Sequence, residues 1–134
     1  MRLFDDLLKT IERYQKPGDL LDVGTGSGLL MTAAERRGWT AKGVEYSAEA
    51  AEFARNELGL EVAAGDVRAA PPGPFNAIVF NHVLEHVKDP VGDVRHARSL
   101  LRPGGVLVIG VPNFGSWMAR LRGPNWASLH PEQH

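Results

Sequence analysis

The sequence has no cysteine, few aromatic residues, almost no net charge and no long apolar run. The absence of cysteine excludes disulfides, thiolate metal sites and cysteine nucleophiles. A net charge of −1 argues against nucleic-acid binding through phosphates, which needs a clear basic excess. No apolar run approaches membrane-spanning length, and the acid-containing N-terminal segment lacks the apolar core of a signal peptide. We therefore expect a cytoplasmic protein that binds neither nucleic acid nor a membrane.

The composition is that of one globular domain. The chain has 134 residues, of which 43% are hydrophobic and 23% are charged, and this length provides one core. We expect a single domain over residues 1–134. Within it, the patterns predict an N-terminal helix over residues 1–16, a ligand-binding core over residues 18–113 and a tail over residues 114–134.

Strand and helix patterns alternate along the core. Buried strands are predicted over residues 19–24, 40–45, 60–65, 75–81 and 106–111. Helices are predicted over residues 29–37 and 47–58, the latter with Ser47 as N-cap and Gly59 past its end. A third helix is marked by Val91, Val94, Ala97, Leu100 and Leu101 and ends at Pro103–Gly105. This order predicts an α/β fold, a doubly wound, Rossmann-like and mainly parallel sheet of about five strands.

A glycine-rich loop, "LLDVGTGSGLL" over residues 20–30, follows the first predicted strand. Gly24, Gly26 and Gly28 let the backbone turn sharply and let a ligand approach without meeting a Cβ atom. Ligands of doubly wound sheets bind at the carboxyl ends of the strands, where this loop lies. Because many nucleotide sites use glycine-rich turns, the loop alone leaves the ligand open.

Three acidic residues narrow the choice of ligand. Glu45 ends the second strand, 23 residues after Asp22, where a carboxylate accepts from both ribose hydroxyls of an adenosine. Asp66, after the third strand, can accept from an exocyclic amine. Asp22 would face an ammonium group rather than a phosphate. Carboxylates beside a glycine loop suit a cationic nucleoside better than a pyrophosphate.

Five motifs then identify a family resemblance. They are "LLDVGTGSG", "GVEYS", "GDV", "FNAIVFNHVLEHVKDP" and "LLRPGGVLVIGVPN", in this order over about residues 18–113. Together they resemble the class I S-adenosylmethionine-dependent methyltransferases, particularly the small-molecule group that includes ubiquinone-biosynthesis-type enzymes. The resemblance implies S-adenosylmethionine as cofactor, S-adenosylhomocysteine as product, a small-molecule methyl acceptor and no metal.

The resemblance also implies roles for individual residues. Asp22 and Gly24 would hold the methionine end of the cofactor, and Glu45 would bind the ribose. The implied cofactor-binding set is Asp22, Gly24, Thr25, Gly26, Gly28, Glu45, Tyr46, Asp66, Val67, Asn81 and His82. Within it, Tyr46 packs on the adenine, Asp66 and Val67 lie at the adenine edge, and Asn81 and His82 lie near the transferred methyl. His82 is the candidate general base, because its unperturbed pKa of about 6.5 suits neutral pH.

The tail departs from the family pattern. Such enzymes usually continue into an antiparallel pair that completes a seven-stranded sheet, whereas only 21 residues follow Asn113. We therefore expect the sheet to lack its last two strands and the chain to be a fragment or to cover its fifth strand differently. In the second case residues 114–134, with Trp117 and Leu121 on one helical face, would pack across that strand or exchange with a second copy to form a homodimer.

Three other functions stay open at this point. One is a truncated cofactor-binding module without turnover. Another is a nicotinamide-dependent oxidoreductase, although Leu29 occupies the place of its third glycine. The last is a zinc hydrolase, because His82, Glu85 and His86 match H-x-x-E-H; its further ligand would have to be Glu132, the only acidic residue after Asp93.

Overall fold

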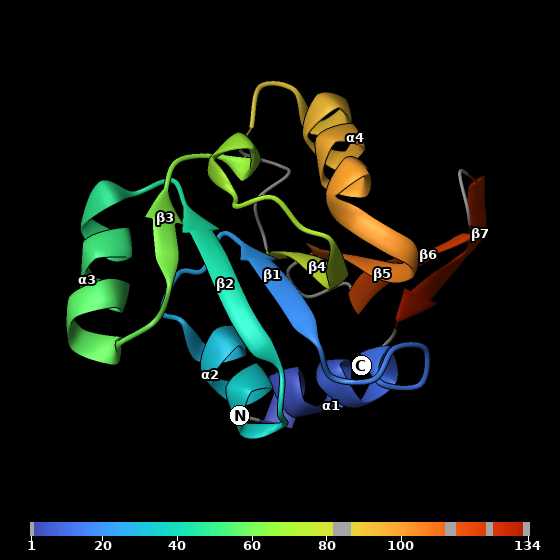
Figure 1. Cartoon of the computed structure of the whole chain (residues 1–134), viewed down its shortest axis with the longest axis horizontal. Coiled ribbons are helices and arrows are strands. Elements are labelled where there is room, and N and C mark those ends of the chain that lie inside the picture. The colour runs from blue at the N-terminus through green and yellow to red at the C-terminus, as the bar shows by residue number, and fades with distance from the viewer. Residues whose placement is uncertain (1, 82–86, 112–114, 123–124, 133–134) are drawn as a thin grey trace.

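The computed structural model describes residues 2–81, 87–111, 115–122 and 125–132. Helices and strands alternate through most of the chain (Figure 1). The helices are α1 (Arg2–Ile11), α2 (Leu29–Arg36), α3 (Ala48–Leu58) and α4 (Pro90–Leu100), with a short 3₁₀ turn η1 (Val67–Ala69). The strands are β1 (Asp19–Val23), β2 (Thr40–Glu45), β3 (Val62–Ala64), β4 (Phe75–Asn81), β5 (Leu101–Val111), β6 (Gly115–Arg122) and β7 (Asn125–Glu132).

The strands form one sheet in the order β3-β2-β1-β4-β5-β6-β7. β1 pairs in parallel with β2 on one side and with β4 on the other, and β3 and β5 continue the parallel pairing outward. This confirms the predicted doubly wound parallel sheet. Since the strand order reverses at β1, the loop after β1 lies at the switch point, where such sheets bind ligands.

The sheet does not end at the fifth strand. β6 pairs antiparallel with β5, and β7 pairs antiparallel with β6. The expectation that the last two strands are missing is therefore wrong, and so is the helical spacing assumed for Trp117 and Leu121. Within this chain the tail covers the β5 edge by hydrogen-bonded pairing, because an unpaired strand edge leaves its backbone groups without partners.

Two apolar layers enclose the parallel part of the sheet. α1, α2 and α3 pack on one face, where Leu20 of β1 points, and α4 with η1 packs on the other, where Leu21 points. Figure 1 shows α1 and α2 together on the opposite side of the sheet from α4. No helix in the described part of the chain is long and apolar enough to cross a membrane.

Two predicted helix boundaries differ from the observed ones. The first helix ends at Ile11 rather than residue 16, and the chain continues in tight turns, with the Tyr14 N–H donating to the Ile11 carbonyl. α4 ends at Leu100, because Leu101 already pairs with Phe75 of β4. Val91, counted as part of the apolar face of α4, is 65% exposed.

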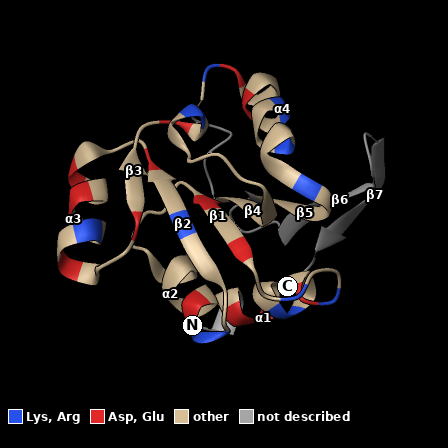
Figure 2. Ribbon diagram, viewed as in Figure 1, with Lys and Arg blue, Asp and Glu red and all other residues tan. Residues whose placement is uncertain are grey.

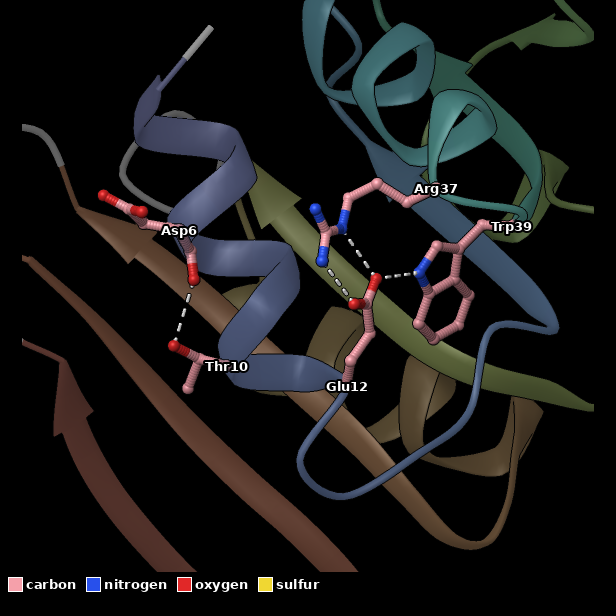
Figure 3. A network of polar contacts seen from close by, with 5 residues as sticks. All are labelled: Asp6, Thr10, Glu12, Arg37 and Trp39. Atoms are coloured by element: carbon pink, nitrogen blue, oxygen red, sulfur yellow. Dashed lines mark hydrogen bonds and ion pairs between the residues drawn. The ribbon is translucent and has the colours of Figure 1, made fainter.

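Glu12 joins α1 to the end of α2 (Figure 3). Its carboxylate accepts two hydrogen bonds from Arg37, at 2.9 and 2.6 Å, and one at 3.0 Å from the indole Nε1 of Trp39. Trp39 is only 3% exposed, so its N–H depends on this acceptor. The Arg37 hydrogen bond is the main cause that lowers the pKa of Glu12, against an opposing contribution from burial.

Replacing Glu12 by alanine is expected to lower the free energy of unfolding by about 2–3 kcal/mol, because a charged hydrogen-bond partner is removed and the Trp39 N–H is left buried. The lowered pKa means that this stability is present above about pH 4.5 and is lost as pH falls through the folded-state value. Urea unfolding at pH 7 and pH 3 measures both effects. Glu57→Ala, an exposed change on α3, is the control. If the Glu12→Ala protein were as stable as this control at pH 7, the stabilising role assigned to Glu12 would be wrong.

Candidate functional site

The glycine loop after β1 adopts backbone conformations that favour glycine. Gly24, Gly26 and Gly28 have φ angles of 84°, 53° and 82°. The Gly24 N–H donates to the Val44 carbonyl at 2.8 Å, which ties the loop to the end of β2. A Cβ atom added at Gly26 would have no neighbour within 4 Å, whereas one at Gly28 would meet the Leu60 side chain at 2.8 Å. The loop is therefore packed against the core at Gly28 and exposed at Gly26, where a ligand can approach its backbone.

Two buried polar side chains at this loop have no hydrogen-bond partner among the described residues. Asp22 is 0% exposed and Thr25 is 2% exposed, yet both carboxylate oxygens of Asp22 and the hydroxyl of Thr25 are unpaired. Asp22 lies within the sheet, opposite Gly43 of β2 and Val79 of β4. Buried polar groups in folded proteins are nearly always paired, so exceptions call for an explanation such as a ligand.

Burial raises the pKa of Asp22 well above its ordinary value, and the negative charge of Glu45 raises it further. A cation placed beside the carboxylate would reverse both effects, because an opposite charge at close range favours the ionised form. A strongly perturbed acidic group beside an open glycine loop is typical of a functional site. The arrangement therefore suits a ligand that brings a positive charge to Asp22.

Glu45, at the end of β2, contacts both the loop and the start of α3. One of its oxygens accepts the Gly26 N–H at 2.8 Å, and the other accepts the Ser47 N–H at 3.0 Å. Each carboxylate oxygen has two acceptor positions, so one on each oxygen is left for a ligand hydroxyl. Glu45 thus holds the glycine loop and still has the capacity to accept from a diol.

The residues predicted for the adenine lie after β2 and β3. Tyr46 is 42% exposed; partial burial together with the charges of Asp93 and Asp66 raises its pKa to about 12. Asp66 caps η1 by accepting the Arg68 N–H at 2.9 Å, and its side chain is 43% exposed. The Val67 side chain is fully buried in the core, so any ligand contact of Val67 would involve its main chain.

Sequence reasoning missed a pair of charged residues beside this site. Asp93 of α4 is 4% exposed and accepts a hydrogen bond from Arg68 at 2.6 Å. A signal was present in the sequence, because Asp93 precedes the buried Ala97 by four residues and so lies on the buried face of α4. A carboxylate on such a face needs a cationic or hydrogen-bonding partner.

Figure 2 shows acidic residues on β1, at the end of β2 and along α3, and basic residues on α4. Asn81 is the last residue of β4, and its backbone is paired with Gly110 of β5. His82, Glu85 and His86 lie outside the described residues. Within the described part of the chain, no three histidine, aspartate or glutamate side chains are grouped as metal ligands.

The chain matches a known protein family over its whole length. The family described as "Methyltransferase domain" matches residues 1–134. The chain belongs to this family. The resemblance to class I S-adenosylmethionine-dependent methyltransferases is thereby confirmed, and neither the nicotinamide nor the zinc alternative is favoured.

This methyltransferase domain is similar to ubiquinone biosynthesis O-methyltransferases from two bacteria. It is 36% identical over 110 residues to a ubiquinone biosynthesis O-methyltransferase of Xanthomonas campestris pv. campestris. The matched residues cover 75% of this chain and 46% of that protein. The corresponding protein of Xylella fastidiosa is 38% identical over 102 residues, which cover 70% of this chain and 42% of the relative. The chain thus spans less than half the length of these relatives.

A solved structure shares the fold. It is the S-adenosylmethionine-bound structure of CalS10, an amino pentose methyltransferase from Micromonospora echinaspora involved in calicheamicin biosynthesis. The TM-score is 0.73 at 21% sequence identity, and the match covers 92% of this methyltransferase domain and 64% of that chain. The likeness supports the doubly wound fold observed here.

Proposed function

We propose that the domain binds S-adenosylmethionine along the carboxyl ends of β1, β2 and β3 and transfers its methyl group to a small-molecule acceptor. The observation that carries the proposal is the carboxylate of Asp22, which is fully buried and has no hydrogen-bond partner among the described residues, beside a glycine loop that is open at Gly26. An α-ammonium group is the kind of partner that this carboxylate lacks.

The other contacts to the cofactor are assigned to residues of the glycine loop and of the strand ends. Asp22 and Gly24 hold the methionine end, and Thr25 offers there a buried hydroxyl that has no partner in the part of the chain that the structure describes. Glu45 accepts from the ribose hydroxyls while it keeps the loop in place through the Gly26 N–H. At the far end, Asp66 accepts from the adenine amine, and the half-exposed ring of Tyr46 packs on the base.

The bound cofactor supplies a sulfonium methyl with a good leaving group. The protein's main task is therefore to align the acceptor with the methyl–sulfur bond, which can contribute about 7–11 kcal/mol when the geometry is near attack. Asn81 ends β4 at the same edge of the sheet. We assign Asn81, and His82 as the next residue in the sequence, to the methyl-bearing end. His82 would take a proton from an acceptor that must lose one, such as a phenol.

The names of the curated relatives support a small-molecule acceptor methylated at oxygen. A screen of phenols, carboxylates and amines for methyl transfer from labelled S-adenosylmethionine identifies the acceptor class. Saturable cofactor binding without transfer to any acceptor would instead support the module without turnover.

A homodimer stays a prediction from the sequence, which sedimentation analysis tests.

Replacing Glu45 by alanine is expected to weaken S-adenosylhomocysteine binding by about 1–3 kcal/mol, because the ribose hydroxyls lose their acceptor and the Gly26 N–H is released. Calorimetric titration measures the change. Glu52→Ala, which removes an exposed acid of α3, controls for loss of charge.

The same titration of the unaltered domain tests the proposed function. We expect saturable binding of one S-adenosylhomocysteine and none of NAD⁺. No heat with S-adenosylhomocysteine at millimolar concentration would rule the proposal out, and unchanged affinity in Glu45→Ala would remove Glu45 from the site.

A further inference from the structure

A cluster of charged side chains joins the ends of β2 and β3 to α4. Asp66 and Arg68 belong to the segment after β3, Tyr46 follows β2, and Asp93 lies in the first half of α4. The Arg68 guanidinium lies between the two carboxylates, 2.6 Å from Asp93 and 3.8 Å from Asp66. The charge of Asp93 also acts on the Tyr46 hydroxyl. The cluster thus contains two of the residues assigned to the adenine, Tyr46 and Asp66.

Arg68 restrains the Asp66 carboxylate in two ways. Its backbone N–H donates to one oxygen at 2.9 Å, and its guanidinium faces the other oxygen. Apolar packing does little to fix this carboxylate, because the Asp66 side chain is 43% exposed and η1 has only three residues. The main-chain N–H holds one oxygen whichever side chain stands at position 68. The direction of the other oxygen therefore depends on the Arg68 guanidinium, while the exposed side of the carboxylate stays available to a ligand.

Asp93 fixes Arg68 in turn. The Arg68 side chain is 50% exposed and would be free to move without an anchor, but the Asp93 side chain is 5% exposed and is held by α4. A short, charge-assisted hydrogen bond to a buried carboxylate is stronger than one between exposed groups. Asp93 is thus the rigid member of the pair, and it holds the Arg68 guanidinium in place.

We propose that Arg68, anchored on Asp93, is a positioning residue that orients the Asp66 carboxylate for recognition of the adenine amine. The inference rests on the proposed function and adds a determinant of base specificity to it. Because Asp66 can only accept, it favours an amine over a carbonyl at the same position of the base. That preference depends on the direction in which the carboxylate points, and so on Arg68.

The test is a calorimetric comparison of two ligands, S-adenosylhomocysteine and S-inosylhomocysteine, in which a carbonyl replaces the amine. We expect Arg68→Ala to weaken S-adenosylhomocysteine binding about tenfold and to lower the preference over the inosyl ligand by a similar factor. Arg68→Lys keeps the charge but lacks the planar guanidinium group. Its affinity and its preference should therefore lie between those of the unaltered domain and those of Arg68→Ala. Asp93→Asn should act in the same direction as Arg68→Ala.

Arg95→Ala, an exposed change on α4, is the matched control and should alter neither affinity nor preference. A purely structural role would lower both affinities equally and leave the preference intact, which would overturn the inference. Unchanged affinities in Arg68→Ala would also overturn it. Failure of the unaltered domain to bind S-adenosylhomocysteine would overturn the proposed function and this inference together. Thermal unfolding of each variant shows that the compared proteins are folded.

Discussion

Replacing Asp22 by asparagine is expected to stabilise the unliganded domain near neutral pH and to weaken S-adenosylhomocysteine binding by 100-fold or more. Asp22 is fully buried without a hydrogen-bond partner among the described residues, so its ionised form is costly in the empty site. The amide has nearly the same shape and no charge. We expect a gain of about 1–3 kcal/mol in the free energy of unfolding. Binding suffers because removing one partner of a buried charge pair costs about 3–5 kcal/mol.

The pH dependence of stability gives a second measure of the same residue. Because the folded-state pKa of Asp22 is raised above 3.8, the folded protein keeps a proton that the unfolded chain releases. Stability from this group is therefore full below about pH 3.8 and is lost as pH rises through the raised value. Urea unfolding over this range should show the decline in the unaltered domain, and Asp22→Asn should remove that contribution.

Asp19→Asn is the matched control, because it makes the same change at the amino end of the same strand. It should leave both affinity and stability close to those of the unaltered domain. If Asp22→Asn bound S-adenosylhomocysteine with unchanged affinity, the carboxylate would have no ligand contact. A loss of stability in Asp22→Asn would mean that the carboxylate has a favourable partner in the empty site.

Replacing His82 by alanine is expected to lower the turnover of a proton-losing acceptor by about 10²–10⁴-fold, the usual contribution of a general base. Affinity for S-adenosylhomocysteine should stay nearly constant, because a group that acts only in the transition state does not contribute to cofactor binding. Single-turnover methyl transfer and calorimetry separate the two quantities once the screen has supplied an acceptor.

His96→Ala, on α4, controls for the loss of an imidazole elsewhere in the domain. Equal losses of turnover and cofactor affinity in His82→Ala would make His82 a residue that shapes the cofactor site. Turnover that stays within threefold of the unaltered domain would exclude it as the base.

The parallel part of the fold could be predicted from the sequence because its signals are local. The apolar run before Gly24, the Ser47 cap and the Gly59 stop each act within a few residues, and the structure confirms all three. The tail could not be predicted in this way. Residues 115–132 have no clear strand alternation, and their strands arise from pairing with β5 and with each other. Tertiary pairing of this kind overrides local preference.

The same distinction between local signals and tertiary packing applies to the residues of the candidate site. Asp22 and Glu45 could be chosen from the sequence, because Asp22 interrupts an apolar strand beside the glycine loop and Glu45 ends the next predicted strand, 23 residues later. The partner of Asp93 could not be chosen, because Arg68 is 25 residues away in the sequence and meets Asp93 only when α4 packs over η1. The buried position of Val67 likewise depends on that packing.

The central claim is that Asp22 receives the ammonium group of the cofactor. The most direct test titrates the unaltered domain and Asp22→Asn with two ligands, S-adenosylhomocysteine and 5′-methylthioadenosine, which lacks the amino acid end. We predict that the substitution weakens binding of the first by 100-fold or more and changes binding of the second by less than about threefold. An equal loss for both ligands, or no loss for either, would contradict the claim.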